Sequence, residues 1–370
     1  TLSGSTFAVY PSITSSSSRA LTRLLKPEEL WEGLENEKLK RIDKNMNEYL
    51  LKLISLYKQD YCSSSYIYNL TPKKEVEVKD PTGQKRTKII VEDSKEFINL
   101  WNKACHFAEE AREIIMNTGD KEFGAIKSGF IPNSTIVPVL GAILWEHENS
   151  GNNLDETKFK SKLSKWYWSS VLSGDYSGSS NSVMSKDFRE WSSFVQGNSE
   201  GIERVEKVDN DFIENELDLL DVEKGSARYR AIISMLALNN AEDFFKGRII
   251  GIGDYSKEKI NDHHIFPKKI KDLDPEKSIK FQDHKESILN RTLLLDETNK
   301  KIRNDKPSEY LEDILKKIND DKDRLVERMK THFISPKALE YLRENNFDKF
   351  VKEREKTVKK EIRNFLGFRQ

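Results

Sequence analysis

Apolar residues recur at every third or fourth position through most of this chain, which is the spacing of one face of an α-helix. Pro27-Glu28-Glu29-Leu30 has the composition of a helix start, and the apolar spacing continues from there to Ile54. After Asn299 the helical spacing returns and dominates the rest of the chain. Further helices are expected near residues 94–117, 133–148, 156–172, 184–195 and 226–246. The pattern therefore predicts a mainly α-helical fold.

Two short regions depart from the helical spacing and predict β-strands. Val76–Val78 and Lys88–Val91 flank the turn sequence Pro81-Thr82-Gly83, so this region predicts a β-hairpin. Arg291 to Leu295 is rich in Thr and Leu and predicts another strand. Turns or flexible links are expected in the serine-rich stretches 15–18 and 173–182.

Length and composition indicate several units in one polypeptide. The chain has 370 residues, 34% charged and 36% hydrophobic, which is enough apolar material for a core and more than one typical domain. We expect an N-terminal helical segment with the hairpin at 1–92, a helical middle domain at 93–225, and a C-terminal domain at 226–370. The aromatic residues of the middle region are expected to pack in the core and not to stack on bases; they are Trp166, Tyr167, Trp168 and Trp191.

The same composition favours a cytoplasmic protein. No apolar run approaches the length of a membrane span, and the first twenty residues lack the features of an export signal. Cys62 and Cys105 are the only cysteines and form no CxxC pair, so a four-cysteine structural zinc site is excluded and disulfides are not implied.

Candidate chemistry centres on Asp262-His263-His264-Ile265-Phe266-Pro267. Asn290 follows His264 by 26 residues, and Asn299 follows Asn290 by nine. Hydrolysis of a phosphodiester needs a base that is neutral near pH 7, which imidazole provides, and a hard cation that neutralises charge on the phosphate. Paired histidines with a middle and a late asparagine resemble the pattern of HNH nucleases, whose ββα unit wraps one divalent metal. Without the asparagines, the histidines would indicate only a partly exposed strand end.

The pattern suggests a role for each residue. His264 is the expected general base, and the uncharged pair His263 and Asn299 is expected to hold one Mg²⁺ or Mn²⁺, although nickel or zinc could also occupy a histidine site. Asp296, Glu297 and Thr298 provide helix-start chemistry that places Asn299 in a first helical turn. Asn290 is expected to bind the backbone of the loop that positions His264, and Ile265 and Phe266 to anchor that turn in the core.

Asp262 and the neighbouring basic residues complete the candidate site. Asp262 could accept a hydrogen bond from a histidine N–H, or could replace His263 as a ligand. The remaining histidines, His106, His147, His284 and His332, are expected at the surface or in helix packing. Phosphate contacts to DNA are expected from five basic residues, with a solvated charged surface as the alternative: Lys268, Lys269, Lys300, Lys301 and Arg303.

The net charge of zero, from 62 basic and 62 acidic residues, counts mildly against a nucleic-acid binder. Its distribution is uneven, however. Residues 257–306 carry 13 basic and 10 acidic side chains, whereas residues 201–225 carry 3 basic and 9 acidic ones. The candidate site therefore lies in the more basic part of the chain.

Several segments outside the motif strengthen the assignment. Seven segments resemble the C-terminal half of GmrSD-type restriction endonucleases. They are the aromatic run near Trp166, Tyr176–Ser179, Tyr229–Leu238, Ala241–Phe244, Lys306–Leu311, His332–Ser335 and Phe347–Arg354. This resemblance extends from about residue 95 to the end. It implies a mainly α fold with an embedded ββα-metal unit near residues 249–306, and it carries over His264 as base, His263 and Asn299 as metal ligands, and Asn290 as the central asparagine.

The resemblance also implies a biological setting. Such proteins cut DNA, leaving 3′-hydroxyl and 5′-phosphate ends, and many belong to bacterial restriction systems against phage. Their N-terminal nucleotide-dependent module, which the resemblance associates with an Asp-Gly-Gln-Gln-Arg run, has no counterpart here, since the chain contains neither that run nor a Gly-Lys-Ser/Thr phosphate loop. We therefore expect that sensor module in the same longer protein or on a partner chain, and Thr1 in place of Met suits the first alternative. A homodimer or successive nicks would allow cleavage of both strands.

Two competing interpretations remain at this point. The first is a non-catalytic DNA-binding or assembly module with a decayed metal site. The second is a nuclease that acts on RNA, because no residue here is known to sense a 2′-hydroxyl.

Overall fold

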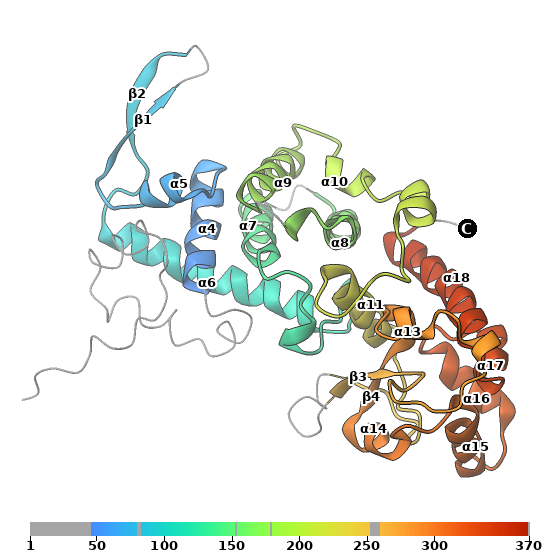
Figure 1. The fold of residues 1–370 in the computed structure, drawn as a ribbon. Helices are drawn as coiled ribbons and strands as arrows, with labels where there is room; N and C mark the ends of the chain where they lie inside the picture. Colours follow the sequence, from blue (N-terminus) through green and yellow to red (C-terminus); the bar gives the residue numbers. More distant parts are fainter. Residues whose placement is uncertain (1–45, 80–82, 152–153, 178–179, 252–259, 369–370) are drawn as a thin grey trace, which may run out of the picture. The chain divides into compact units, whose positions relative to one another are not determined.

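The computed structural model describes residues 46–79, 83–151, 154–177, 180–251 and 260–368. These residues are mainly helical and include two small two-stranded antiparallel sheets (Figure 1). The mainly α prediction is confirmed at this level. The helix start expected at Pro27 and the serine run at 15–18 lie outside the described residues.

Spatial clustering divides the chain into two compact units. Unit 1 comprises residues 1–113, 133–159 and 175–203, and unit 2 comprises residues 114–132, 160–174 and 204–370. The division falls inside three helices, at residues 113/114, 159/160 and 203/204. The domain boundaries expected at 92 and 225 stay a prediction.

Unit 1 is built around a very apolar helix. The helix α7 (Ile136–Asn149) is buried along nearly its whole length and packs against α4 (Met46–Gln59) and α9 (Ser180–Val195). Gly141 permits this packing, because a Cβ there would lie 2.6 Å from a side-chain carbon of Leu53. The short helices of this unit are α5 (Ser64–Tyr68) and α10 (Glu203–Glu206), the second reaching into unit 2.

The predicted hairpin is present in unit 1 as an antiparallel strand pair. Strand β1 (Glu75–Lys79) pairs with β2 (Lys85–Ile89), with Glu77 opposite Thr87. Most of β2 is exposed to solvent. The turn residues 80–82 lie outside the described residues.

The long helices α6 (Ser94–Met116) and α8 (Glu156–Ser173) agree with the predicted helices to within one residue at each end. The aromatic residues of the middle region are buried: Trp166, Tyr167 and Trp191 are fully buried and Trp168 is 1% exposed. Tyr167 stacks on Phe123 with ring centroids 3.7 Å apart. The prediction that these side chains pack in the core is confirmed.

The helix predicted over residues 226–246 ends early. Helix α11 (Ala227–Leu238) begins at an N-cap, Ser226, and ends before Asn240, which has a positive φ of 55°. Residues 241–250 instead form a tight loop closed by the hydrogen bond from Ile250 N to Ala241 O, and they surround the buried Asp243. The helix was predicted to extend to residue 246 because Phe244 and Phe245 continue the helical spacing of apolar residues. In the structure these two side chains are buried but belong to the loop.

The second sheet lies in unit 2 and pairs β3 (Ile260–His264) with β4 (Arg291–Leu295). The helix α14 (Asp296–Ile302) follows β4 directly and packs against both strands (Figure 1). Between the strands lie α13 (Phe281–His284) and two 3₁₀ turns, Pro275–Lys277 and Ile288–Asn290.

Four helices close the chain, in agreement with the expectation that helices dominate after Asn299. They are α15 (Pro307–Lys317), α16 (Lys322–Lys330), α17 (Pro336–Arg343) and α18 (Phe347–Leu366). Phe347 and Phe350 of α18 pack edge-on and tilted against Phe266. The described helices include none with the length and apolar character needed to cross a membrane.

Candidate active site

The two histidines point to opposite faces of β3, as side chains alternate along a strand. His263 lies opposite Thr292 in the ladder, and His264 lies opposite Arg291. All of β4 is buried, so each histidine is held beside a buried strand. His264 is the last residue of β3, and Ile265 and Phe266 after it are fully buried. The prediction that these two residues anchor the turn in the core is confirmed.

His263 and Asn299 are brought together by the direct passage from β4 into α14. The helix begins at Asp296, so Asn299 lies in its first turn as predicted. The buried Asp243 fixes this entry, since its carboxylate accepts hydrogen bonds from Leu295 N at 3.0 Å and Thr298 Oγ1 at 2.6 Å. As a result, His263 Nδ1 lies 2.5 Å from Asn299 Oδ1, although 36 residues separate them in the chain.

The environment keeps His263 uncharged. Burial and the charge of Arg291 together lower its pKa to about 4, and the hydrogen bond with Asn299 offsets only part of their effect. The side chain is 6% exposed, and its Nε2 has no hydrogen-bond partner within the described residues. A neutral imidazole nitrogen and an amide oxygen therefore face each other.

This pair is compatible with a small divalent cation. Two neighbouring ligands of an octahedral Mg²⁺ ion, each about 2.1 Å from it, stand about 3 Å apart. To adopt that spacing the Nδ1 and Oδ1 atoms would need to separate by about 0.5 Å, and the hydrogen that Nδ1 donates to Oδ1 would have to move to Nε2, which has no other partner among the described residues. No cluster of three or more His, Cys, Asp or Glu side chains suitable for a metal occurs among the described residues, so water and substrate oxygens would have to supply the other ligands.

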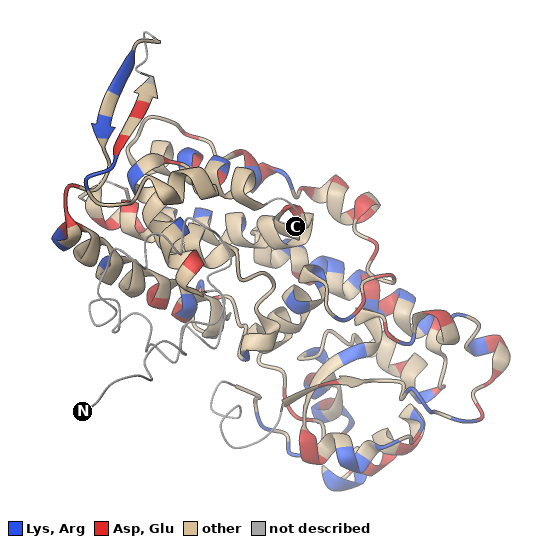
Figure 2. Ribbon diagram, turned by 60° about the vertical axis from the view of Figure 1, so that its left-hand side comes forward, with Lys and Arg blue, Asp and Glu red and all other residues tan. Residues whose placement is uncertain are grey.

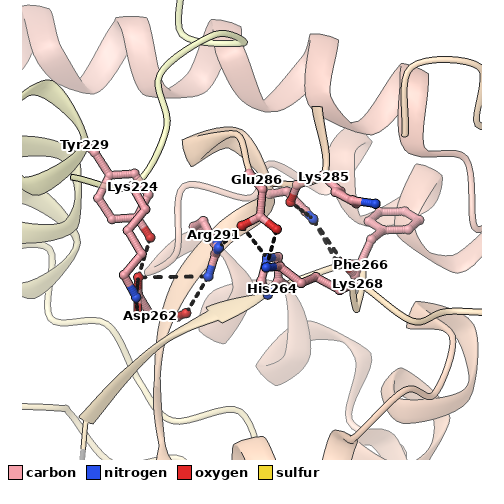
Figure 3. Close-up of polar contacts among 10 residues, drawn as sticks. Lys224, Tyr229, Asp262, His264, Phe266, Lys268, Lys285, Glu286 and Arg291 are labelled. Atoms are coloured by element: carbon pink, nitrogen blue, oxygen red, sulfur yellow. Dashed lines mark hydrogen bonds and ion pairs between the residues drawn. The ribbon is translucent and has the colours of Figure 1, made fainter. Parts of the chain in front are cut away.

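His264 belongs to a separate polar network on the other face of β3 (Figure 3). Its Nε2 lies 3.3 Å from Glu286 Oε2. The same carboxylate accepts hydrogen bonds from Arg291 and, at 2.5 Å, from Lys268 Nζ. Glu286 therefore joins one imidazole to two cations, and motif analysis did not identify it.

The pKa values of His264 and Glu286 determine which groups of this network are charged. Burial and the nearby Arg291 lower the pKa of His264 to about 4, with Glu286 opposing the shift. Burial favours a higher pKa for Glu286, but Lys268 and Arg291 outweigh it and bring that pKa to about 2. Near neutral pH the network therefore contains a neutral imidazole beside an ionised carboxylate.

Asn290 is fully buried and binds backbone groups on both sides of the loop. Its Oδ1 accepts from Phe266 N at 2.8 Å, and its Nδ2 donates to Phe266 O and to Lys285 O. These are the kinds of contacts expected for a residue that orients the segment after His264, and they place Asn290 away from the His263–Asn299 pair.

The carboxylate of Asp262 was expected to accept a hydrogen bond from a histidine, but its partners are other residues. Its carboxylate accepts from Tyr229 Oη at 2.6 Å and from Lys224 Nζ at 3.1 Å, and its pKa lies below the usual value because these hydrogen bonds outweigh the effect of burial. Within the described residues neither histidine hydrogen-bonds to this carboxylate. In place of the expected hydrogen bond from a histidine, Asp262 accepts one from Tyr229 of α11 (Figure 3).

The five basic residues expected to bind phosphate differ in their contacts and exposure. Lys300 pairs with Asp296 at 2.6 Å, Lys301 lies over the Phe245 ring, and Lys269 is exposed. Lys268 pairs with Glu286, and Arg303 donates to the backbone of its own helix. Acidic and basic positions are interspersed along the described chain (Figure 2).

Two buried residues far along the chain support the strands and were not identified as site residues. His332 Nε2 donates to Glu242 O and its Nδ1 accepts from Thr292 Oγ1, both at 2.6 Å, so this histidine is buried against the sheet rather than at the surface. Arg354 is fully buried, and its guanidinium donates to the backbone oxygens of Ile288, Leu289, Arg291 and His332. The sequence of helix α18 is rich in charged residues, and nothing in it predicts that the side chain of Arg354 is buried.

Comparison with known proteins gives a relative but no function. No family model matches the sequence. The chain is 35% identical over 287 residues to the uncharacterized protein MJ0686 of Methanocaldococcus jannaschii. The match covers 72% of this chain and 46% of that protein, so the chain spans less than half the length of this relative.

Proposed function

We propose that this protein is a metal-dependent endonuclease of the HNH type that hydrolyses DNA phosphodiesters. The observation that carries the proposal is the convergence of His263 with Asn299 where β4 passes into α14, with His264 next in the strand. The strand pair β3–β4 followed directly by α14 supports the proposal that residues near 249–306 contain a ββα-metal unit.

In the proposed reaction, the neutral imidazole of His264 takes a proton from a water molecule. The water oxygen forms a bond to phosphorus while the bond from phosphorus to the 3′-oxygen breaks, and that oxygen receives a proton from solvent. The products are a 3′-hydroxyl and a 5′-phosphate. His263 and Asn299 would hold one Mg²⁺ or Mn²⁺, which when bound neutralises charge on the phosphate and the leaving oxygen.

The remaining residues have positioning and binding roles in this proposal. Asn290 fixes the backbone at Phe266 and so limits the positions open to His264. Lys269 and Arg303, with the lysines at 268, 300 and 301, bind the DNA backbone without reading its sequence. Membership of a restriction system against phage, with a nucleotide-dependent module in the same protein or on a partner, is proposed from the GmrSD resemblance alone.

The alternative function is a DNA-binding or assembly module with a decayed metal site. One observation favours it: within the described residues only His263 and Asn299 converge as ligands, and they already hydrogen-bond to each other. Retention of both asparagines and both histidines favours the catalytic proposal instead.

Cleavage of supercoiled plasmid tests the two functions. Wild-type protein should nick or linearise plasmid with Mg²⁺ or Mn²⁺ and not with EDTA, assayed with and without ATP or GTP. His264→Ala should lower the rate by about 10²- to 10⁴-fold, the usual contribution of a general base, while DNA binding persists. His284→Ala is the matched control, because His284 pairs with Asp221 elsewhere in the unit. Undiminished cleavage by His264→Ala would remove His264 from the reaction, and inactive wild-type protein under every condition would favour the alternative.

A further inference from the structure

A neutral histidine has one ring nitrogen that carries a hydrogen and one that carries a free electron pair, and only the second can act as a base. Which nitrogen is free depends on the hydrogen bond made by the other. At His264 the Nε2 atom faces the Glu286 carboxylate at 3.3 Å. An ionised carboxylate can only accept, so Nε2 must carry the hydrogen.

The other nitrogen of His264 is available. Within the described residues Nδ1 makes no hydrogen bond, and the side chain is 15% exposed. We infer that Glu286 is a positioning residue that fixes the Nε2–H tautomer of His264 and leaves Nδ1 as the nitrogen that takes the proton from water. The catalytic meaning of this inference rests on the proposed function, whereas the tautomer itself does not.

The position of Glu286 is built into the sheet. Arg291, with a side chain only 5% exposed, donates to the Glu286 carboxylate through Nη2 and to the backbone oxygen of Asp262 through Nη1. The arginine lies directly opposite His264 in the ladder, so it fixes the carboxylate relative to the strand that carries the imidazole. Lys268 Nζ holds the second carboxylate oxygen at 2.5 Å.

The segment that carries Glu286 is fixed from both ends as well. The backbone oxygen of the preceding Lys285 accepts from Asn290 Nδ2 at 2.9 Å. Ser287 Oγ donates to Leu219 O at 3.2 Å. The carboxylate is therefore held by its backbone as well as by its side-chain partners (Figure 3).

The charge balance permits this role near DNA. An isolated carboxylate next to the base would repel a phosphate, but the charges of Lys268 and Arg291 accompany this one. Its low pKa, near 2, means that it stays ionised and accepts from Nε2–H over the range in which enzymes of this kind operate.

Nitrogen-15 spectra of the imidazole rings, combined with steady-state plasmid cleavage, test the inference. In the wild-type protein near neutral pH, His264 should show a protonated Nε2 and an unprotonated Nδ1. In Glu286→Ala the two nitrogen shifts should move toward each other as both tautomers become populated. The value of kcat should fall by about 10- to 100-fold, with KM for DNA changed far less, because Glu286 orients the base and does not bind the substrate.

Two further variants separate positioning from a general loss of structure. Glu286→Gln keeps an oxygen that can accept from Nε2–H, so it should retain the wild-type tautomer and more of kcat than Glu286→Ala. Glu340→Gln breaks a different acid–lysine pair, with Lys337 on α17, and should change neither readout. Thermal unfolding of each variant identifies any that is not folded, and the isosteric Glu286→Gln provides the comparison if Glu286→Ala is not.

The outcomes are distinct. An unchanged Nε2–H tautomer in folded Glu286→Ala would overturn the inference, whatever happens to kcat. A shifted tautomer with unchanged kcat would overturn the catalytic role of Glu286. A shifted tautomer in a protein whose wild-type form cleaves no DNA would support the structural part of the inference and contradict the proposed nuclease function.

Discussion

The two small sheets of this protein have the same size and pairing but very different surroundings. Each is an antiparallel pair of five-residue strands. In β1–β2 the cross-strand contact is an ion pair, Lys85 with Glu77, with both side chains more than 60% exposed, which contributes at most about 1 kcal/mol. In β3–β4 every residue of β4 is buried, and the two histidines of β3 have pKa values near 4.

The comparison shows what burial adds to a strand pair. Polar groups on an exposed hairpin keep nearly their solution properties, because water screens them. The same groups beside a buried strand must be paired, and their charge states are set by desolvation and by fixed neighbours such as Arg291 and Glu286. The sheet with unusual charge states is therefore the one expected to carry chemistry.

The largest expected difference between the sheets is in cleavage, through the His264→Ala variant described above. The corresponding change in the exposed hairpin, Lys88→Ala, should leave the chemical step unaltered, since β1–β2 contains no candidate catalytic group. A loss of kcat in folded Lys88→Ala comparable to that of His264→Ala would contradict this division of roles.

Substitutions in the two sheets should also differ in their effect on the free energy of unfolding. Leu293→Ala in β4 removes a fully buried side chain and should lower the free energy of unfolding by about 2–5 kcal/mol. Thr87→Ala in β2, where the side chain is exposed, should change it by about 0.5 kcal/mol or less. Urea unfolding monitored by circular dichroism measures both, and equal costs would show that burial does not distinguish the two sheets.

Metal affinity should depend on α14 and not on the hairpin. Asn299→Ala removes one of two proposed protein ligands and should weaken Mn²⁺ binding by at least about 10- to 100-fold, the range seen when supporting groups of metal sites are lost. Asn261→Ala offers a matched control, since Asn261 Nδ2 donates to Asp296 in the same helix and Asn261 is not one of the proposed ligands. Titration calorimetry that gave equal affinities for Asn299→Ala and the wild type would remove Asn299 from the site.

Acid should destabilise the buried sheet through His332. Burial lowers the pKa of this histidine to about 3, so the folded state stays unprotonated while the unfolded chain binds a proton below its ordinary pKa of 6.5. Stability is therefore complete above pH 6.5 and falls as the pH drops toward 3, by up to about 1.4 kcal/mol per pH unit from this residue. His332→Gln should flatten the dependence of unfolding free energy on pH between about 5 and 6.5, and an unchanged slope would contradict the assignment.

The smallest expected effect concerns DNA affinity. Lys269→Ala removes one exposed cation beside the site and should reduce the slope of log affinity against log salt by about one, without changing sequence preference. The same measurement on Lys88→Ala tests whether the hairpin also contacts DNA. An unchanged slope for Lys269→Ala would show that this lysine lies outside the bound duplex.

Local sequence signals predicted much of the site's framework. Strand Arg291–Leu295 and the helix start before Asn299 could be predicted because a short apolar run that begins with a β-branched Thr is consistent with a buried strand and acidic residues favour a first helical turn. Ile265 and Phe266 were predicted as anchors from their apolar character next to Pro267.

What could not be predicted depends on contacts between distant segments. Asp243 reaches Leu295 across 52 residues, and nothing near Asp243 indicates that its partner is the start of a helix. Glu286 lies among ordinary polar residues, and only the folded sheet brings it to Arg291 and His264. Arg354 lies in a helix with many charged residues. Its burial could not be predicted, because the backbone oxygens that it binds come from distant segments of the chain.

We propose that His263 and Asn299 hold one divalent ion and that His264, the next residue of β3, does not bind it. Electron spin-echo spectroscopy of Mn²⁺ bound to the nitrogen-14 protein measures this directly. We expect one bound Mn²⁺ per chain with coupling from a single histidine nitrogen, lost in His263→Ala and kept in His264→Ala. Coupling that persists in His263→Ala, or wild-type protein that binds no Mn²⁺, would contradict it.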